Sequence, residues 1–290
     1  MTRTLISQAQ LRRGRGRILY WTVLGTVVVL FTLVFIGPLY WMVTGALKSG
    51  QEIAQTPPTL WPQDPQTQNY VDAWSNLNLA KLMFNTFYYA AGAVFFQLVF
   101  DTAAAYALSK LRPVLGNVVL ALMLATLMIP AMVVIVPQYV TAIDLPFVHV
   151  SLLDSPWAIW LPLVANAFNI FLLKRFFDSI PGDFMAAAAI DGAGPLRTLV
   201  SIVLPMSRPI LGVVAIFSVT AVWKDFLWPL LVEPSPNNRT VNVGIYAFST
   251  GLTQNVVIAG AVIAAVPTVL FFLVFQKNIM GGLTTGGLRE

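Results

Sequence analysis

Apolar residues in this 290-residue chain lie in long uninterrupted stretches. An α-helix needs about 20 such residues to cross a hydrocarbon core of about 30 Å. The pattern predicts six helices of this length, over residues 18–43, 82–108, 114–140, 157–177, 199–222 and 256–275. We therefore expect an all-α integral membrane protein with a single transmembrane domain over residues 1–290. Its six-helix bundle spans 18–276, between an N-terminal segment (1–17) and a C-terminal tail (277–290).

Composition agrees with this prediction. Hydrophobic residues make up 57% of the chain and charged residues 10%, against about 45–50% and about 25% in soluble proteins. These values exclude a water-soluble enzyme, a disordered chain and a nucleic-acid-binding domain. The chain has no cysteine and a single histidine, His149, so we expect no catalytic residue, no metal site and no cofactor.

The first apolar stretch follows four arginines, as a secretory signal does. Its apolar run over 18–36 is longer than the roughly 7–15 residues of a signal core. The small residues Thr44, Gly45 and Ala46 make only a weak cleavage site. We interpret the stretch as a retained first helix.

The basic residues predict the orientation of the helices. With the N-terminus in the cytoplasm, most of the 17 lysines and arginines fall on the inner side. These are Arg3, Arg12, Arg13, Arg15, Arg17, Lys110, Arg112, Lys174, Arg175, Arg197, Arg208, Lys277 and Arg289. Only Lys48, Lys81 and Arg239 fall outside, which favours cytoplasmic termini at both ends. An aromatic belt is predicted at the outer ends of the spans, from Trp41, Trp157, Trp160, Trp223 and Trp228.

Two connections between the predicted spans are long. The outer one, 48–81, is rich in proline and polar residues, which indicates a folded but non-helical cap. The inner one, the loop 178–209, contains four alanines at 186–189, which favour a helix. Ser179 can cap this helix, Pro181 fits its first turn and Asp183 favours its positive end.

The same loop contains signals for a turn and a second helix. Gly192, directly after Asp191, can adopt the positive φ that ends a helix. Pro195 can open the next helix. The product is a helix-turn-helix with a smooth alanine face at the inner surface.

At this point the chain resembles the permeases of ATP-binding-cassette importers. Their loop motif is Glu-Ala-Ala, three residues, Gly, nine residues, then Ile, any residue, Leu-Pro. Ala187-Ala188, Gly192 and 202–205 match it, whereas Ala186 replaces the glutamate. The resemblance implies a type I importer permease fold in which this loop is a coupling helix that docks on an ATPase subunit. Its candidate coupling residues are Asp183, Ala186, Ala187, Ala188, Asp191, Gly192 and Pro205.

Two points about this loop stay open. We hypothesise that Asp183, one turn before Ala186, supplies the missing acidic contact. The alternative to a coupling helix is an amphipathic helix at the membrane interface, which is disfavoured because the alanine face lacks large apolar side chains.

Other segments resemble the sugar-importing branch, specifically its maltose-type inner permease. They include Asn69-Tyr70, Asn85-Thr86, 105–107, 127–130, 223–230 and the tail 282–289. The resemblance implies partners: a second permease, two ATPase subunits and an extracytoplasmic solute-binding protein, all at the inner membrane of a prokaryote and in contact with lipid. None of the six lysines follows a glycine, so the chain has no phosphate-binding loop and is not itself an ATPase.

Polar residues within the spans are candidates for the substrate pathway, because polar groups in a bilayer must face protein or water. The candidates are Gln97, Gln138, Asn166, Asn169, Trp223, Lys224 and Asp225. Lys224 stands where the family usually has asparagine. Its side chain either extends to the outer interface beside Trp223 and Trp228, which we favour, or is buried if the span starts near Pro209. For Asp101 we expect a structural role, paired with a lysine or arginine at the inner surface.

Other functions remain as alternatives. The chain could serve an importer of a non-sugar solute such as glycerol phosphate. An ion-coupled secondary transporter is less favoured, since such proteins typically carry intramembrane carboxylate or histidine relays or repeated halves. A membrane enzyme is disfavoured because the sequence has no cluster of catalytic residues.

Overall fold

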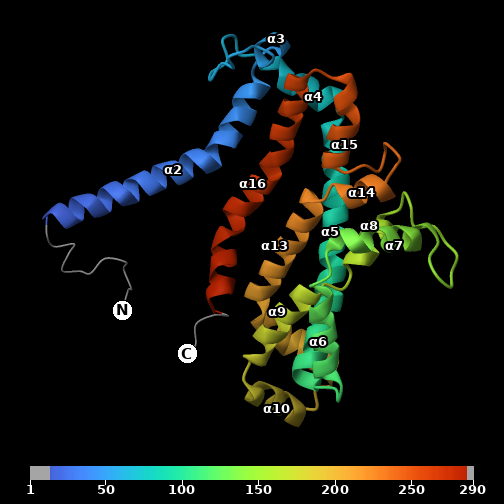
Figure 1. The fold of residues 1–290 in the computed structure, drawn as a ribbon. Coiled ribbons are helices and arrows are strands. Elements are labelled where there is room, and N and C mark those ends of the chain that lie inside the picture. Colours follow the sequence, from blue (N-terminus) through green and yellow to red (C-terminus); the bar gives the residue numbers. More distant parts are fainter. Residues whose placement is uncertain (1–13, 286–290) are drawn as a thin grey trace. The chain divides into compact units, whose positions relative to one another are not determined.

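The computed structural model describes residues 14–285, and every regular element within that range is helical (Figure 1). The longer helices are α2 (Gly14–Ala46), α4 (Gln68–Asn76), α5 (Leu79–Tyr106), α6 (Gly116–Thr126), α7 (Ala131–Ile143), α8 (Pro156–Leu163), α9 (Ala167–Asp178), α10 (Gly182–Ile190), α13 (Arg208–Lys224), α15 (Val241–Phe248) and α16 (Gln254–Thr285). Shorter ones are α3 (Gly50–Ile53), α11 (Pro195–Thr198), α12 (Leu204–Met206) and α14 (Leu227–Val232). Single turns of other helix types are η1 (Ala107–Leu111), η2 (Leu199–Val203) and η3 (Ser249–Gly251).

The described chain divides into two compact units, 14–73 with 252–262, and 74–251 with 263–285. In the first unit, the cap after α2 is built around Glu52. Its carboxylate accepts hydrogen bonds from the Thr59 hydroxyl (2.6 Å) and the Gln63 N–H (3.1 Å). The prediction of a non-helical cap is wrong, because the connection contains α3 and α4. The Ser49 side chain caps α3 by accepting from the Glu52 N–H.

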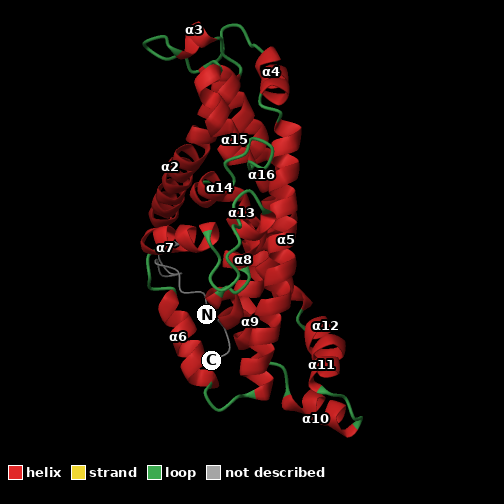
Figure 2. Cartoon of the chain, turned by 90° about the vertical axis from the view of Figure 1, so that its right-hand side faces the viewer, coloured by secondary structure: helices red, strands yellow, loops and turns green. Residues whose placement is uncertain are grey.

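In the second unit, α5 is the central helix, and α13, α9 and α8 pack along it (Figures 1 and 2). Helix α10 lies at one end of this group, and α15 lies at the other. Everything that the candidate site uses belongs to this unit.

Three helices are long and apolar enough to cross a membrane without a break, over 16–46, 79–111 and 254–276. They confirm the first, second and sixth predicted helices. The other three predicted spans are each a bent pair: α6 with α7 at 102°, α8 with α9 at 47°, and 195–206 with α13 at 84°. If each pair is one span, the total is the six that were predicted.

The predicted helices over 114–140, 157–177 and 199–222 are each interrupted, and prolines explain the breaks. Proline lacks an N–H and disfavours helical geometry in the preceding residue. Pro130 precedes α7 with ψ of 132°, and Pro162 lies one residue before the end of α8. Pro205 and Pro209 flank the bend at Ser207.

Two apolar clusters fill the second unit, with polar side chains between them along α5, α9 and α13. The cluster at the α10 end includes Ala105, Tyr106, Ile170, Leu173, Phe177, Val213 and Val214. The cluster at the other end includes Tyr89, Ala93, Ile159, Trp160, Val222, Trp228 and Val232. Gln97, Asn169 and Ser218 occupy the intervening positions on α5, α9 and α13 and are almost fully buried.

The predicted aromatic belt is wrong for Trp160, Trp223 and Trp228, which are buried. Their indole N–H groups donate to the backbone carbonyls of Tyr89 (3.0 Å), Ala264 (3.2 Å) and Ala158 (2.9 Å). Each tryptophan therefore packs inside the protein and satisfies a carbonyl there. Trp41 and Trp157 are exposed, as a belt requires.

Candidate functional site: a coupling helix and a polar cavity

The inner loop forms the predicted helix-turn-helix. Helix α10 ends at Asp191, and Gly192 follows with φ of +73°. Only glycine adopts this conformation without strain, so the turn depends on it. Pro195 opens α11 as predicted. The predicted cap by Ser179 is wrong: its hydroxyl donates to the Phe176 carbonyl at the end of α9, and Pro181 precedes α10 instead.

Polar contacts fix the end of α9 and the residues just before α10 to η1, which follows α5 directly. The Lys110 ammonium donates to the Ile180 carbonyl (2.9 Å), and the Ser109 hydroxyl donates to the Asp178 carboxylate (2.7 Å). Lys174 also pairs with Asp178 (2.7 Å). Ile180, Leu199 and Met185 pack into the apolar cluster at this end of the unit. The sequence analysis missed this clamp, although Lys110 and Asp178 both stand at the inner ends of predicted spans.

The exposed face of α10 is not free of bulky groups. Ala186, Ala187 and Ala189 are exposed and Ala188 is buried. Around them Phe184, Ile190 and Leu196 are 46%, 87% and 74% exposed. The expectation of a smooth alanine face is therefore wrong, because α10 and the turn leave these apolar side chains on the surface. We call these exposed residues the α10 surface. It consists of the small side chains of the exposed alanines and the larger apolar side chains of Phe184, Ile190 and Leu196.

The other candidate coupling residues lie around this surface. Asp183 is exposed in the first turn of α10, as predicted. Asp191 is exposed at the C-terminal end of α10. Pro205 is exposed in α12, just before the 84° bend.

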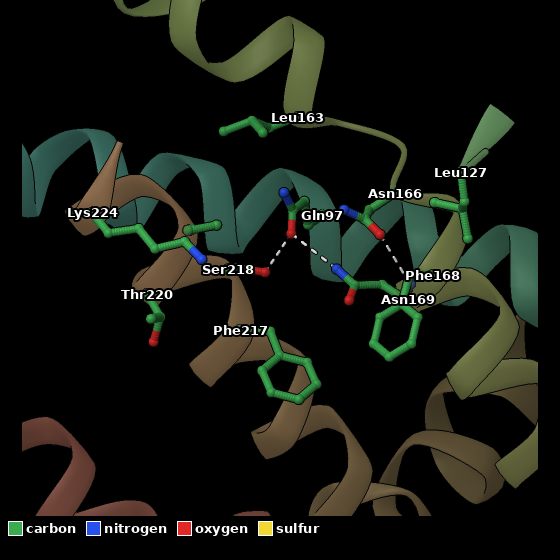
Figure 3. A pocket seen from close by; sticks show the side chains of 11 residues that line it. Gln97, Leu127, Leu163, Asn166, Phe168, Asn169, Phe217, Ser218, Thr220 and Lys224 are labelled. Atoms are coloured by element: carbon green, nitrogen blue, oxygen red, sulfur yellow. Dashed lines mark hydrogen bonds between the residues drawn. The ribbon is translucent and has the colours of Figure 1, made fainter. Parts of the chain in front are cut away.

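A cavity of about 350 Å³ lies beside the polar positions of α5, α9 and α13 (Figure 3). Gln97, Asn166, Asn169, Ser218 and Lys224 line it. Asn169 donates to the Gln97 side-chain oxygen (3.1 Å), and the Ser218 hydroxyl contacts the same oxygen. The cavity thus brings together four of the seven residues proposed for the pathway.

Lys224 is the last residue of the 17-residue α13, roughly 24 Å along this helix at 1.5 Å per residue. Its side chain extends along the cavity with the ammonium group toward Ser218 (Figure 3). Lys224 is exposed, whereas its neighbours Trp223 and Trp228 are buried, and its position at the outer interface stays a prediction.

The prediction that Asp101 pairs with an inner-surface cation is wrong. Asp101 is fully buried, and one of its oxygens accepts from the Asn166 N–H (2.9 Å). The break between α8 and α9 leaves that N–H without a helical partner. Asp101 therefore stabilises a helix break next to the cavity. Its other oxygen has no hydrogen-bond partner.

The remaining pathway candidates lie elsewhere. Gln138 and Asp225 line a second cavity of about 330 Å³, together with Met132, Pro162 and Trp228. Trp223 packs edge-to-face on Phe87, with ring centroids 4.7 Å apart. Leu163 borders both cavities. In the described part of the chain, no group of His, Cys, Asp and Glu side chains has the arrangement of a metal site.

Glu233, which the sequence analysis did not identify, is a buried carboxylate after α14. It is fully buried, and neither of its oxygens has a hydrogen-bond partner. Burial, reinforced by the nearby charge of Asp154, raises the pKa of Glu233 to about 8. Asp154 itself accepts from the Ser235 N–H (2.9 Å) and hydroxyl (2.7 Å).

Comparisons with known proteins agree with this arrangement. The diacetylchitobiose uptake system permease protein of Streptomyces coelicolor is 29% identical, with 91% of this chain and 87% of that protein covered. The sn-glycerol-3-phosphate transport system permease protein of Rhizobium meliloti is 31% identical, with 90% and 93% covered. A crystal structure of a bacterial ABC transporter involved in import of the acidic polysaccharide alginate matches with a TM-score of 0.80 at 24% identity, covering 91% of this chain and 98% of that one.

A family model matches residues 102–279, which make up more than half of the chain. The matched segment contains α10, the bent helix pairs and most residues of the polar cavity. The chain belongs to the family of binding-protein-dependent transport system inner membrane components.

Proposed function

We propose that this chain is the permease subunit of an ATP-driven importer that takes up a carbohydrate delivered by an extracytoplasmic binding protein. It works with a second permease and with two ATPase subunits that bind the α10 surface from the cytoplasm. Both termini then lie in the cytoplasm. ATP hydrolysis takes place in the partner subunits.

The observation that carries this proposal is the α10 surface. It is exposed, it has small side chains at its centre, and the segment that leads into its helix is held to η1 through Lys110 and Asp178. Such a helix transmits force because it moves with the bundle core rather than independently. A partner that closes around the α10 surface therefore displaces α9, α13 and the cavity that they line.

The named relatives support a carbohydrate as cargo. One takes up diacetylchitobiose, and another takes up sulfoquinovosyl glycerol in Agrobacterium fabrum, at 30% identity over 87% of this chain. A further structural match was determined in complex with an alginate-bound periplasmic protein, which supports a binding-protein partner. A permease for a non-sugar solute stays a second candidate, because the glycerol phosphate relative is equally similar.

The test is copurification followed by reconstitution. Tagged chain should bring down an ATPase and a second permease, and the complex in proteoliposomes should show ATPase stimulation by a carbohydrate with its binding protein. Purification of the chain without an ATPase would overturn the importer assignment. Stimulation by glycerol 3-phosphate but by no carbohydrate would overturn the sugar assignment alone.

The role of Asp183 is tested in the same assay. If Asp183 replaces the missing motif glutamate, Asp183→Ala lowers ATPase copurification and the double variant Asp183→Ala/Ala186→Glu restores it. Unchanged assembly in Asp183→Ala contradicts this role. Asp144→Ala, which removes an exposed carboxylate far from α10 in sequence, is the matched control.

A further inference from the structure

Lys224 is the single charged residue that lines the polar cavity. Within residues 14–285 it forms no ion pair and no hydrogen bond. Lys224 is exposed in this chain, so its ammonium group is accessible beside the polar lining of the cavity. The position therefore indicates a function for the charge rather than a structural pairing.

Asp225, the next residue, attracts Lys224 electrostatically but forms no ion pair with it in the described part of the chain. Helix α13 ends between the two residues, and the Asp225 carboxylate interacts with the backbone N–H groups of Phe226 and Trp228 at the start of α14. It lines the second cavity instead. Asp101 is directed at the Asn166 N–H and does not line the polar cavity. The ammonium group thus remains available to a ligand.

The other walls of the cavity suit a sugar. Amide groups of Gln97, Asn166 and Asn169 can exchange hydrogen bonds with hydroxyl groups. Phe168 and Phe217, whose ring centroids are 6.0 Å apart, offer apolar faces to the C–H side of a sugar ring. A volume of about 350 Å³ falls within the range of small-molecule sites, roughly 300–1,000 Å³.

We propose that the polar cavity binds an anionic carbohydrate, with Lys224 contacting its carboxylate, sulfonate or phosphate group. This inference rests on the proposed import of a carbohydrate, and it names the chemical class of that substrate. The amides and the two phenyl rings recognise the sugar, and Lys224 selects for the charge. A neutral sugar leaves the ammonium group unpaired in the cavity and is the poorer substrate.

The experiment uses the reconstituted complex with its binding protein and measures ATPase stimulation by matched pairs of neutral and anionic sugars. Suitable probes are cellobiose against cellobiouronate, and trigalactose against trigalacturonate. We expect the wild-type complex to respond to the anionic member at a lower concentration. Lys224→Gln should raise the half-saturating concentration of the anionic sugar by roughly 10-fold or more, the effect of losing a charged hydrogen bond. The neutral sugar should change little, and Lys224→Arg should keep the preference.

Lys81→Gln is the matched control, because it removes the same charge from a residue whose ammonium group contacts Asn237 outside the cavity. Every variant is compared with the same binding protein, so the ratio between variants reports on the permease alone. A wild-type preference for neutral sugars, or an unchanged ratio in Lys224→Gln, overturns the inference and leaves carbohydrate import intact. A complex that responds to no carbohydrate overturns the proposed function as well. If Lys224→Gln fails to assemble, Lys224→Asn, which carries the residue usual at this position in related permeases, is measured in the same way.

Discussion

The α10 surface and the polar cavity both depend on interrupted helices, but they are built in opposite ways. The α10 surface follows from local signals, since Gly192 ends one helix and Pro195 opens the next within a few residues. The cavity follows from contacts over long separations, such as Asp101 with Asn166 and Gln97 with Ser218. We propose that one region binds a partner subunit and that the other binds a solute. Substitutions should therefore separate assembly from substrate handling.

The largest effect is expected at the turn after α10. Gly192→Val places a β-branched residue at φ of +73°, which costs roughly 1–2 kcal/mol or more. Because the turn orients the α10 surface, substrate-stimulated ATPase activity should fall by about tenfold or more. The measurement is ATPase activity in proteoliposomes, with copurified ATPase as a second readout.

Gly182→Ala is the control for this change, since a Cβ at Gly182 meets open space and its φ is not positive. Equal loss of activity in both variants would show that the α10 surface tolerates no substitution at all. Full ATPase activity in Gly192→Val would show that coupling does not depend on the conformation of this turn. In either variant, the preference between neutral and anionic sugars should stay unchanged.

A smaller effect, on stability, is expected at the helix break beside the cavity. Asp101→Ala removes the acceptor of the Asn166 N–H, and an unsatisfied buried donor costs about 1–3 kcal/mol. Thermal unfolding in detergent, followed by circular dichroism, should shift to lower temperature. Asp101→Asn, which keeps an acceptor oxygen, should shift it less. An unchanged unfolding temperature in Asp101→Ala would contradict this role.

The smallest effect per step of the measurement is a pH dependence of stability from Glu233. Its pKa in the folded protein, about 8, lies above its ordinary value of 4.5. Between these values the folded state holds a proton that the unfolded state has lost, so stability falls as pH rises through this window. The slope is at most about 1.4 kcal/mol per pH unit for one proton. Unfolding measured from pH 5 to 8 should show this slope.

Glu233→Gln keeps the shape of the side chain and removes its titration. The pH dependence should therefore become weaker by the contribution of this one group, whereas Asp64→Asn, at an exposed carboxylate that contacts Gln66, should leave it unchanged. If the wild type and Glu233→Gln show the same slope, Glu233 is ionised in the folded protein.

The comparison also explains how much the sequence could predict. The α10 loop was predictable because glycine and proline act on their own residues, and the motif spacing around Gly192 placed the turn correctly. The six apolar stretches were also predictable, because the length of an apolar stretch can be read directly from the sequence. The prolines that break three of these stretches are visible in the sequence. The sequence does not give the angle of each bend, which is 47° in one helix pair and 102° in another. Tertiary packing decides that angle.

The polar cavity could not be predicted from local sequence signals. Gln97, Asn166 and Asn169 could be selected as polar residues within spans, but their meeting point depends on how α5, α9 and α13 pack. Nothing local to Asp101 indicates that its partner is a backbone N–H 65 residues away. Similarly, the buried tryptophans look like belt residues until the carbonyls that they contact are known. Side chains that satisfy a broken backbone are found only in the folded structure.

The three buried tryptophans have a spectroscopic consequence. Trp160, Trp223 and Trp228 each tie a bent helix pair or its neighbour to another helix through an indole hydrogen bond, whereas Trp21 and Trp61 are well exposed. The fluorescence of the three buried tryptophans should be shielded from a water-soluble quencher. It should also change with any movement that breaks their indole hydrogen bonds. With the exposed tryptophans replaced by phenylalanine, the intrinsic fluorescence of the chain reports on helix rearrangement. Transport movements could then be followed without an attached dye.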